Sequence, residues 1–188
     1  NKNKILRNYV INQLLDKIDK NTKIISTTGY TSRELFQIRS SKNTNIGQDF
    51  YMVGGMGHAT SVSIGVALNS KKQVICLDGD GSLIMHLGSL LTAGSSERKN
   101  FKHILLNNGS HESVGGQKIK TEKLNFKNII KTFGYKKFFI VKNKAELGRY
   151  LPLLLKSKGP SFMQIQIKDG SLINLKRPKN FVEIKKKF

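Results

Sequence analysis

Apolar positions along this chain alternate between two spacings. Some segments place apolar residues three or four positions apart, which is typical of amphipathic helices, and others are short continuous apolar or β-branched runs, which are typical of strands buried on both faces. Strands are predicted at 23–27, 49–53, 73–77, 102–106, 137–141 and 161–167. Helices are predicted at 5–18, from Thr31 onward, and at 58–68, 82–93, 125–133 and 144–156. This alternation predicts an α/β fold in which helices cover both faces of a mostly parallel sheet.

The size and punctuation of the chain indicate a single domain. It has 188 residues and no linker rich in Pro, Gly or Ser, so we expect one domain over 1–188, with 168–188 as a basic tail that the pattern leaves unassigned. No apolar run is long enough to span a bilayer, and the single cysteine, Cys76, fits the cytoplasm. Because the chain begins at Asn1, we expect it to be part of a longer or processed protein.

The charge first suggests a polyanionic partner. Lys and Arg total 33 against 12 Asp and Glu, a formal net charge of +21, and phosphate neutralisation by such residues drives nucleic-acid binding. However, 27 of the 33 are Lys, whereas base reading favours Arg. We therefore do not expect a nucleic-acid partner, although a basic binding module with a degenerate nucleotide fold remains an alternative. The charge can instead steer an anionic substrate to its site.

Three predicted strands end in unusual residues, at the edge where ligands bind in parallel sheets. These ends read Gly54-Gly55-Met56-Gly57, Gly79-Asp80-Gly81 and Asn107-Asn108. Asp80 is suited to hold a Mg²⁺ ion that itself bridges phosphate groups. The amide oxygens of Asn107-Asn108 are further hard ligands for such an ion. Ser82 can cap the next helix, whose free N–H groups can face an anion. When each motif is taken alone, two alternatives remain: Asp80 can be a helix cap, and Asn108-Gly109 can form a turn.

Together the two motifs are more specific. Gly79-Asp80-Gly81, followed after 25 residues by Asn107-Asn108, resembles the signature of the thiamine-diphosphate enzymes. The resemblance implies that Mg²⁺ is held by Asp80, Asn108 and the carbonyl of Ser110. It also implies a set of residues around the cofactor, namely Thr28, Gly29, Gly54, Gly55, Met56, Gly79, Asp80, Gly81, Ser82 and Asn108. In that set the carbonyl of Gly54 receives the 4′-amino group and Met56 is an apolar wedge that keeps the cofactor bent.

Within those enzymes, three stretches are similar to the phosphonopyruvate decarboxylase family. They are Thr27 to Leu35, Val53 to Ala59, and Asn107 to Gln117. The resemblance implies decarboxylation of phosphonopyruvate to phosphonoacetaldehyde and CO₂. The sulfopyruvate decarboxylase beta subunit is the alternative, and His111-Glu112-Ser113 favours the phosphonate enzyme. Two positions depart from the pattern, because many relatives have Lys where this chain has Tyr30 and Ser where it has Gly55.

Three residues are candidates for contact with the substrate. His111 and Glu112 follow the second metal-binding strand, and His58 begins a helix at the same edge. A loop histidine or helix-start histidine with only a structural role is the alternative. The family's pyrimidine-binding domain is not found in this sequence, so we expect it upstream or on a second chain, in a homo-oligomer or hetero-oligomer. We interpret His86, His103 and Cys76 as structural.

Overall fold

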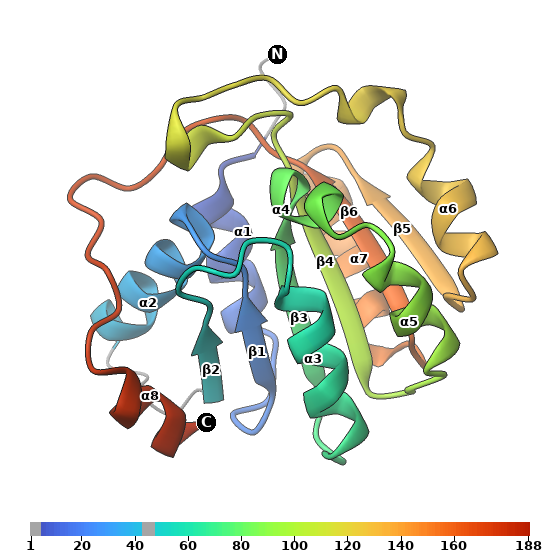
Figure 1. Cartoon of the computed structure of the whole chain (residues 1–188), viewed down its shortest axis with the longest axis horizontal. Coiled ribbons are helices and arrows are strands. Elements are labelled where there is room, and N and C mark those ends of the chain that lie inside the picture. The colour runs from blue at the N-terminus through green and yellow to red at the C-terminus, as the bar shows by residue number, and fades with distance from the viewer. Residues whose placement is uncertain (1–4, 43–47) are drawn as a thin grey trace.

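The computed structural model describes residues 5–42 and 48–188, and within them the strands form one fully parallel sheet (Figure 1). The six strands lie in the order β2-β1-β3-β4-β6-β5. Their bounds are β1 Lys23–Ser26, β2 Gln48–Tyr51, β3 Val74–Gly79, β4 Phe101–Asn107, β5 Lys137–Val141 and β6 Ser161–Gln166. The predicted α/β class is confirmed, and all six carboxyl ends lie along one edge of the sheet.

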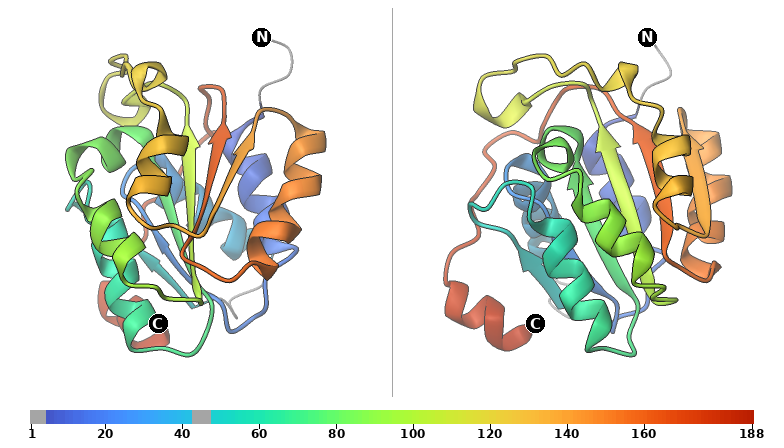
Figure 2. Two further views of the ribbon diagram at one scale, coloured as in Figure 1. Left: turned by 90° about the vertical axis from the view of Figure 1, so that its right-hand side faces the viewer. Right: turned by 45° about the vertical axis from the view of Figure 1, so that its right-hand side comes forward.

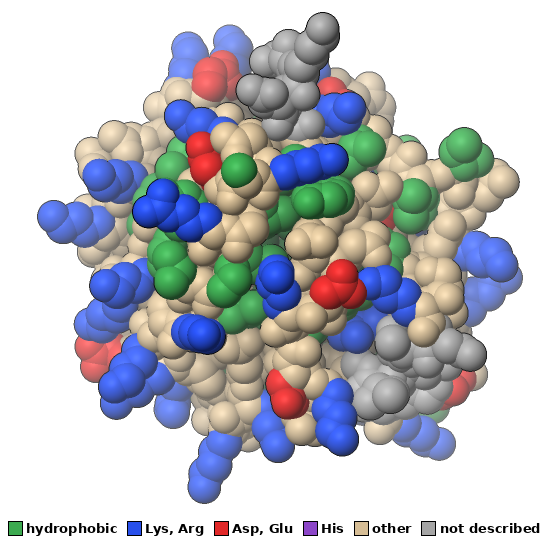
Figure 3. All heavy atoms as spheres, turned by 180° about the vertical axis from the view of Figure 1, so that it is seen from behind, with side chains coloured by type: hydrophobic (Ala, Val, Ile, Leu, Met, Phe, Trp, Pro, Cys, Tyr) green, Lys and Arg blue, Asp and Glu red, His purple; other side chains and the backbone are tan. Residues whose placement is uncertain are grey.

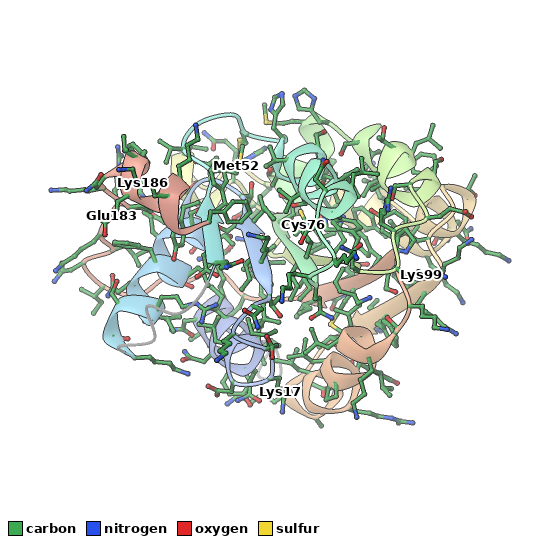
Figure 4. All side chains as sticks on the ribbon, turned by 90° about the horizontal axis from the view of Figure 1, so that it is seen from below. Lys17, Met52, Cys76, Lys99, Glu183 and Lys186 are labelled. Atoms are coloured by element: carbon green, nitrogen blue, oxygen red, sulfur yellow. The ribbon has the colours of Figure 1, made fainter. Side chains whose placement is uncertain are left out.

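Helices cover both faces of this sheet (Figure 2). One layer consists of α1 (Arg7–Leu15), α2 (Tyr30–Ser41) and α7 (Lys144–Lys156). The other consists of α3 (Ala59–Leu68), α4 (Asp80–Met85), α5 (Ser89–Ser95) and α6 (Phe126–Thr132). Successive strand residues face opposite layers, so Ile75 packs under the first layer and Cys76 under the second. Figure 4 shows Cys76 in the interior and Lys17 and Lys99 at the periphery.

The prediction of one helix over 82–93 is wrong in detail. The first helix, α4, already starts at Asp80 and ends at Met85, and α5 begins after Gly88. Backbone torsion leaves the helical region at His86, where φ is −135° and ψ is 49°. Met85, His86 and Gly88 are exposed, so burial does not hold a helix here, and glycine has a low helix propensity.

The segment left unassigned, 168–188, packs against the same sheet. After β6 it crosses the carboxyl edge as a strap (residues 168–180), and the final helix, α8 (Phe181–Lys187), lies beside β2 (Figure 1). The rings of Phe50 and Phe188 are 5.4 Å apart, and Lys23 Nζ lies 4.3 Å from the centre of the Phe188 ring. The tail therefore belongs to this fold, and the strap brings its residues to the strand ends.

Figure 3 shows the molecule from behind, and the described Lys and Arg side chains on that face are dispersed rather than clustered. Lys and Arg side chains stand separately around its rim and across it, with apolar and polar atoms between them. Among the described residues visible on that face, the basic side chains do not form a continuous stripe, which would be the footprint of a nucleic-acid site. Within the described ranges, no helix has the length and apolar character needed to cross a membrane.

Candidate active site at the carboxyl edge of the sheet

Two neighbouring strands bring the predicted metal ligands together. β3 and β4 are paired, with Gly79 opposite Leu106, so Asp80 and Asn108 follow adjacent strand ends. A pocket at this edge is lined by most of the residues singled out in the sequence. They are Thr28, Met56, Gly79, Asp80, Gly81, Ser82, Asn108, Ser110, His111 and Glu112. Residues that are far apart in the sequence thus surround one pocket at the carboxyl ends of the strands, where ligands bind in parallel sheets.

Asp80 is almost fully buried beneath the loop that follows β4. Its relative exposure is 2%, and Oδ2 accepts the Gly109 N–H at 2.8 Å. Burial raises the pKa of Asp80 above its ordinary value, while the Gly109 N–H opposes that rise. Asn108 and Ser110 line the same pocket, so a buried carboxylate, an amide and a backbone carbonyl are available there as hard oxygen donors. This donor set fits a small divalent cation such as Mg²⁺.

Ser82 is arranged to donate its hydroxyl proton to a ligand. Its Oγ accepts the Thr27 hydroxyl at 2.6 Å and the Gly57 N–H at 2.9 Å. With both lone pairs engaged, the remaining proton of Ser82 is available to an anion in the pocket. Gly81 lies against the imidazole of His111, since a Cβ built there would lie 2.5 Å from Cε1 and Nδ1 of His111. Glycine is required for this close approach.

A second hollow adjoins the first beyond the end of β2. It is lined by Thr28, Gly29, Ser32, Arg33, Met52, Val53, Gly54, Met56, Ser113, Val114, Arg177, Pro178 and Phe181. Gly54 and Gly55 have φ of 72° and 55°, a region that disfavours residues with a side chain. The structure therefore gives a conformational reason for the glycine at position 55. Val53 and Val114 are 60% and 64% exposed, so apolar side chains flank this hollow in the isolated chain.

His58 is not among the residues that line either hollow. It is exposed, its ring centre is 4.3 Å from that of His86, and its Nδ1 is 3.2 Å from the carbonyl oxygen of Gly55. His103, which we interpret as structural, is fully buried in the second layer, and its Nδ1 is 3.2 Å from the Tyr135 hydroxyl. Contact of His58 with substrate remains a prediction that these positions do not favour.

Glu112 is held by a cation that the sequence analysis missed. Arg7, on α1, forms an ion pair with Glu112, and its Nη1 is 3.6 Å from Oε1 of Glu34. Burial is the largest influence on Glu34 and raises its pKa, whereas Arg7 lowers it. Helical spacing from the buried Val10 and Ile11 would have placed Arg7 on the inner face of its helix. That signal was present in the sequence.

Tyr30, at the position where the resemblance leads us to expect Lys, has two guanidinium groups near its ring. The Cζ atoms of Arg7 and Arg33 are 5.7 Å and 5.8 Å from the centre of its ring. Both distances are within the range of a cation–π contact. Two cations from α1 and α2 thus stand beside the position that lacks the lysine.

Asp169, in the strap, is the second residue that the sequence analysis missed. Its Oδ1 accepts hydrogen bonds from Asn108 Nδ2 at 2.9 Å and from Ser110 Oγ at 3.0 Å. An Asp-Gly pair one residue after the last predicted strand was the signal, by the same strand-end rule that drew attention to Asp80.

Comparison with known proteins gives a family match over most of the chain. A family model described as "Thiamine pyrophosphate enzyme, C-terminal TPP binding domain" matches residues 27–165. In solved structures, a chain described as a thiamin diphosphate-dependent enzyme from Mycobacterium smegmatis superposes with a TM-score of 0.68 at 18% identity. That match covers 88% of this chain and 32% of the other. At that identity, the likeness concerns the fold alone.

Two kinds of curated relative match at similar identity. Phosphonopyruvate decarboxylase of Streptomyces viridochromogenes is 37% identical over 169 residues, covering 90% of this chain and 41% of the relative. Sulfopyruvate decarboxylase subunit beta of Methanocaldococcus jannaschii is 36% identical over 126 residues, covering 66% of this chain and 64% of the relative. The chain thus spans about two fifths of the Streptomyces protein.

Proposed function

The chain belongs to the thiamine pyrophosphate enzymes and contains their C-terminal TPP-binding domain, and we propose from this that it forms the diphosphate-binding half of a Mg²⁺-dependent 2-oxo acid decarboxylase. The observation that carries the proposal is the meeting of Asp80, Asn108 and Ser110 at two adjacent strand ends. We place the enzyme in the cytoplasm, where the single buried thiol of Cys76 stays reduced.

The chain's own residues divide into a metal side and an anion side. Asp80, the amide oxygen of Asn108 and the carbonyl of Ser110 would hold Mg²⁺. Ser82 would donate its remaining proton to a diphosphate oxygen, beside the backbone of Gly81. Gly79, Thr28 and Gly29 line the surrounding hollows and complete this contact surface.

The aminopyrimidine half of the cofactor would lie toward the second hollow. There Met56 contributes an apolar wall to both hollows, and the exposed Gly54 and Gly55 leave the backbone carbonyl of Gly54 accessible to an amino group. When bound, thiamine diphosphate supplies a nucleophilic carbon and the electron sink for loss of CO₂. The protein's contribution is to bind and orient the cofactor and substrate and to limit access by water.

Phosphonopyruvate is the substrate that we propose, with phosphonoacetaldehyde and CO₂ as products. The Streptomyces phosphonopyruvate decarboxylase matches across 90% of this chain, and the chain retains His111-Glu112-Ser113. His111 is half-buried beside Gly81 and can donate to an anionic group or hold a proton. Sulfopyruvate is the second candidate, because the methanogen beta subunit is similar at 36% identity.

A pyrimidine-binding domain would complete the site, upstream on the same chain or on a second chain. The exposed apolar side chains Val53 and Val114 flank the second hollow, where such a domain would cover them. Because the site would then form between two domains, we propose an oligomer, either of one chain or of two kinds. The beta-subunit name of the methanogen relative supports the second arrangement.

The experiment uses the complete gene product with its partner, Mg²⁺ and thiamine diphosphate, and measures aldehyde formation from phosphonopyruvate, sulfopyruvate and pyruvate. We expect phosphonopyruvate to react fastest and Asp80→Ala to abolish both turnover and Mg²⁺-dependent cofactor binding while the far-ultraviolet circular dichroism is retained. Faster sulfopyruvate turnover would overturn the substrate assignment. Unchanged cofactor affinity in Asp80→Ala would overturn the site assignment.

A further inference from the structure

One oxygen of Asp169 accepts hydrogen bonds from the side chains of two proposed metal ligands. Asp169 Oδ1 is 2.9 Å from Asn108 Nδ2 and 3.0 Å from Ser110 Oγ. The strap reaches them because β6 pairs with β4, with Gln166 opposite Asn107, so both segments leave the sheet at the same height. A carboxylate that lies 61 residues further along the chain thus contacts the loop that would hold the cation.

The Asn108 amide can serve a cation only in one orientation. Its oxygen is a ligand, whereas its NH₂ group is a donor and must point elsewhere. The nitrogen of that group, Nδ2, is 2.9 Å from Asp169 Oδ1, 3.3 Å from Glu112 Oε2 and 3.4 Å from Ser110 Oγ. With carboxylates on the nitrogen side, Oδ1 of Asn108 is on the other side of the amide, where it accepts the Ser110 N–H at 3.3 Å.

We propose that Asp169 is a positioning residue for the metal site, which fixes the amide orientation of Asn108 and the loop conformation at Ser110 through these two hydrogen bonds. The inference rests on the proposed function, since it concerns the Mg²⁺ ligands assigned there. Partners that orient metal ligands contribute about 10–100-fold to metal affinity. Asp169 has that role here without itself being assigned as a ligand.

The strap is fixed well enough to carry this role. Its Gly170 N–H donates to Glu112 Oε1 at 2.5 Å, and its Leu172 N–H donates to Glu34 Oε1 at 2.9 Å. Arg7 lies between those two acids, forming an ion pair with Glu112 and approaching Glu34. The buried arginine therefore ties the strap and the metal-binding loop to α1.

The other side of the Asp169 carboxylate faces a lysine. Lys118 approaches the other oxygen, Oδ2, at 3.4 Å, and its side chain is 76% exposed. Lys118 therefore offers a control that changes the charge near Asp169 without removing either bond to the loop.

The test compares Asp169→Ala, Asp169→Asn and Lys118→Met in the complete enzyme with its partner. Calorimetric titrations with Mg²⁺, and separately with Ca²⁺, are made at saturating thiamine diphosphate, so the readout is binding. We expect Asp169→Ala to weaken Mg²⁺ by about 10–100-fold. Asp169→Asn should retain most of the affinity, because its amide oxygen still accepts, and Lys118→Met should bind Mg²⁺ like the wild type.

The cation comparison separates positioning from general loss of structure. Mg²⁺ requires near-ideal octahedral geometry, whereas Ca²⁺ tolerates irregular ligands. Asp169→Ala should therefore weaken Mg²⁺ more than Ca²⁺ at an unchanged thermal midpoint.

Equal loss for both cations, a loss in Asp169→Asn as large as in Asp169→Ala, or unchanged Mg²⁺ affinity in Asp169→Ala would overturn the inference. If the wild type itself bound no Mg²⁺ with thiamine diphosphate, the proposed function would fail first.

Discussion

Replacing Arg7 by Met would leave two acids near each other without the cation between them. The side chains of Arg7 and Glu34 are 5% and 0% exposed, and that of Glu112 is 17% exposed. Met keeps much of the volume of the arginine stem but removes the charge. In the wild type, Glu112 already raises the pKa of Glu34 and Arg7 lowers it, so the acids are close enough to influence each other.

The magnitude follows from the burial of this group. Removing one partner of a buried ion pair destabilises a protein by about 3–5 kcal/mol. Glu112 is less buried than the other two and can be partly solvated once released, so we expect the lower end, about 3 kcal/mol, for Arg7→Met at pH 8.

The effect should depend on pH, in a direction that the contacts determine. Burial raises the pKa of Glu34, and loss of Arg7 raises it further. Between the ordinary and the raised pKa the folded state binds more protons than the unfolded state, so the stability of the variant rises as pH falls through that window. The destabilisation by Arg7→Met should shrink there by about 1.4 kcal/mol for each unit of additional pKa shift.

The assay is native-state hydrogen exchange of peptides from β1 and β4 in the complete protein at pH 5 and pH 8, with rates corrected for the intrinsic effect of pH. This readout reports the free energy of opening of this domain separately from any other. Arg33→Met is the matched control, since Arg33 lies over the same Tyr30 ring and should cost about 0.5–1 kcal/mol at both pH values. A destabilisation by Arg7→Met that is the same at both pH values would refute the reasoning.

Three further changes test other parts of the fold and site. Gly81→Ala would place a Cβ 2.5 Å from the imidazole of His111, so calorimetry should show weaker cofactor binding with an unchanged thermal midpoint. Gly94→Ala would drive a Cβ into the carbonyl oxygen of Phe133, and denaturant unfolding should show a loss of about 3 kcal/mol. Burial lowers the pKa of Lys102 to about 8, so the unfolded state keeps a proton that the folded state has lost above that pH. Wild-type stability should therefore rise between pH 8 and pH 10 in urea titrations, and Lys102→Met should lack this rise.

Local pattern was sufficient to predict most of the elements and the convergence of Asp80 and Asn108 on one edge of the sheet. Asp80 and Asn108 follow strands whose continuous apolar character shows in the sequence, and parallel pairing brings such ends together. The helix break at His86 was missed, because a small-residue and apolar pattern continues through it.

The contacts that hold the proposed metal ligands in place were not predictable in the same way. The Arg7–Glu112 ion pair joins residues 105 positions apart, and helical spacing shows only that Arg7 faces inward, not which acid it meets. Asp169 lay in a tail without periodic pattern, whose course depends on hydrogen bonds to Glu112 and Glu34. Such partners are set by tertiary packing, which one sequence does not specify.

The distribution of acids is consistent with the proposed cation at this site. The chain has only 12 Asp and Glu against 33 Lys and Arg, yet four of the acids meet around one strand edge, at Asp80, Glu112, Asp169 and Glu34. Like charges so close together are destabilising unless a cation or donors offset them. Arg7 and backbone N–H groups offset the charges of Glu34 and Glu112, and Lys118 offsets that of Asp169.

For Asp80, the Gly109 N–H offsets the charge at Oδ2. The raised pKa of Asp80 shows that the effect of burial is larger than that of this hydrogen bond. A divalent cation at Asp80 would stabilise the ionised carboxylate, and the excess of positive charge elsewhere would attract the diphosphate and an anionic 2-oxo acid to that cation.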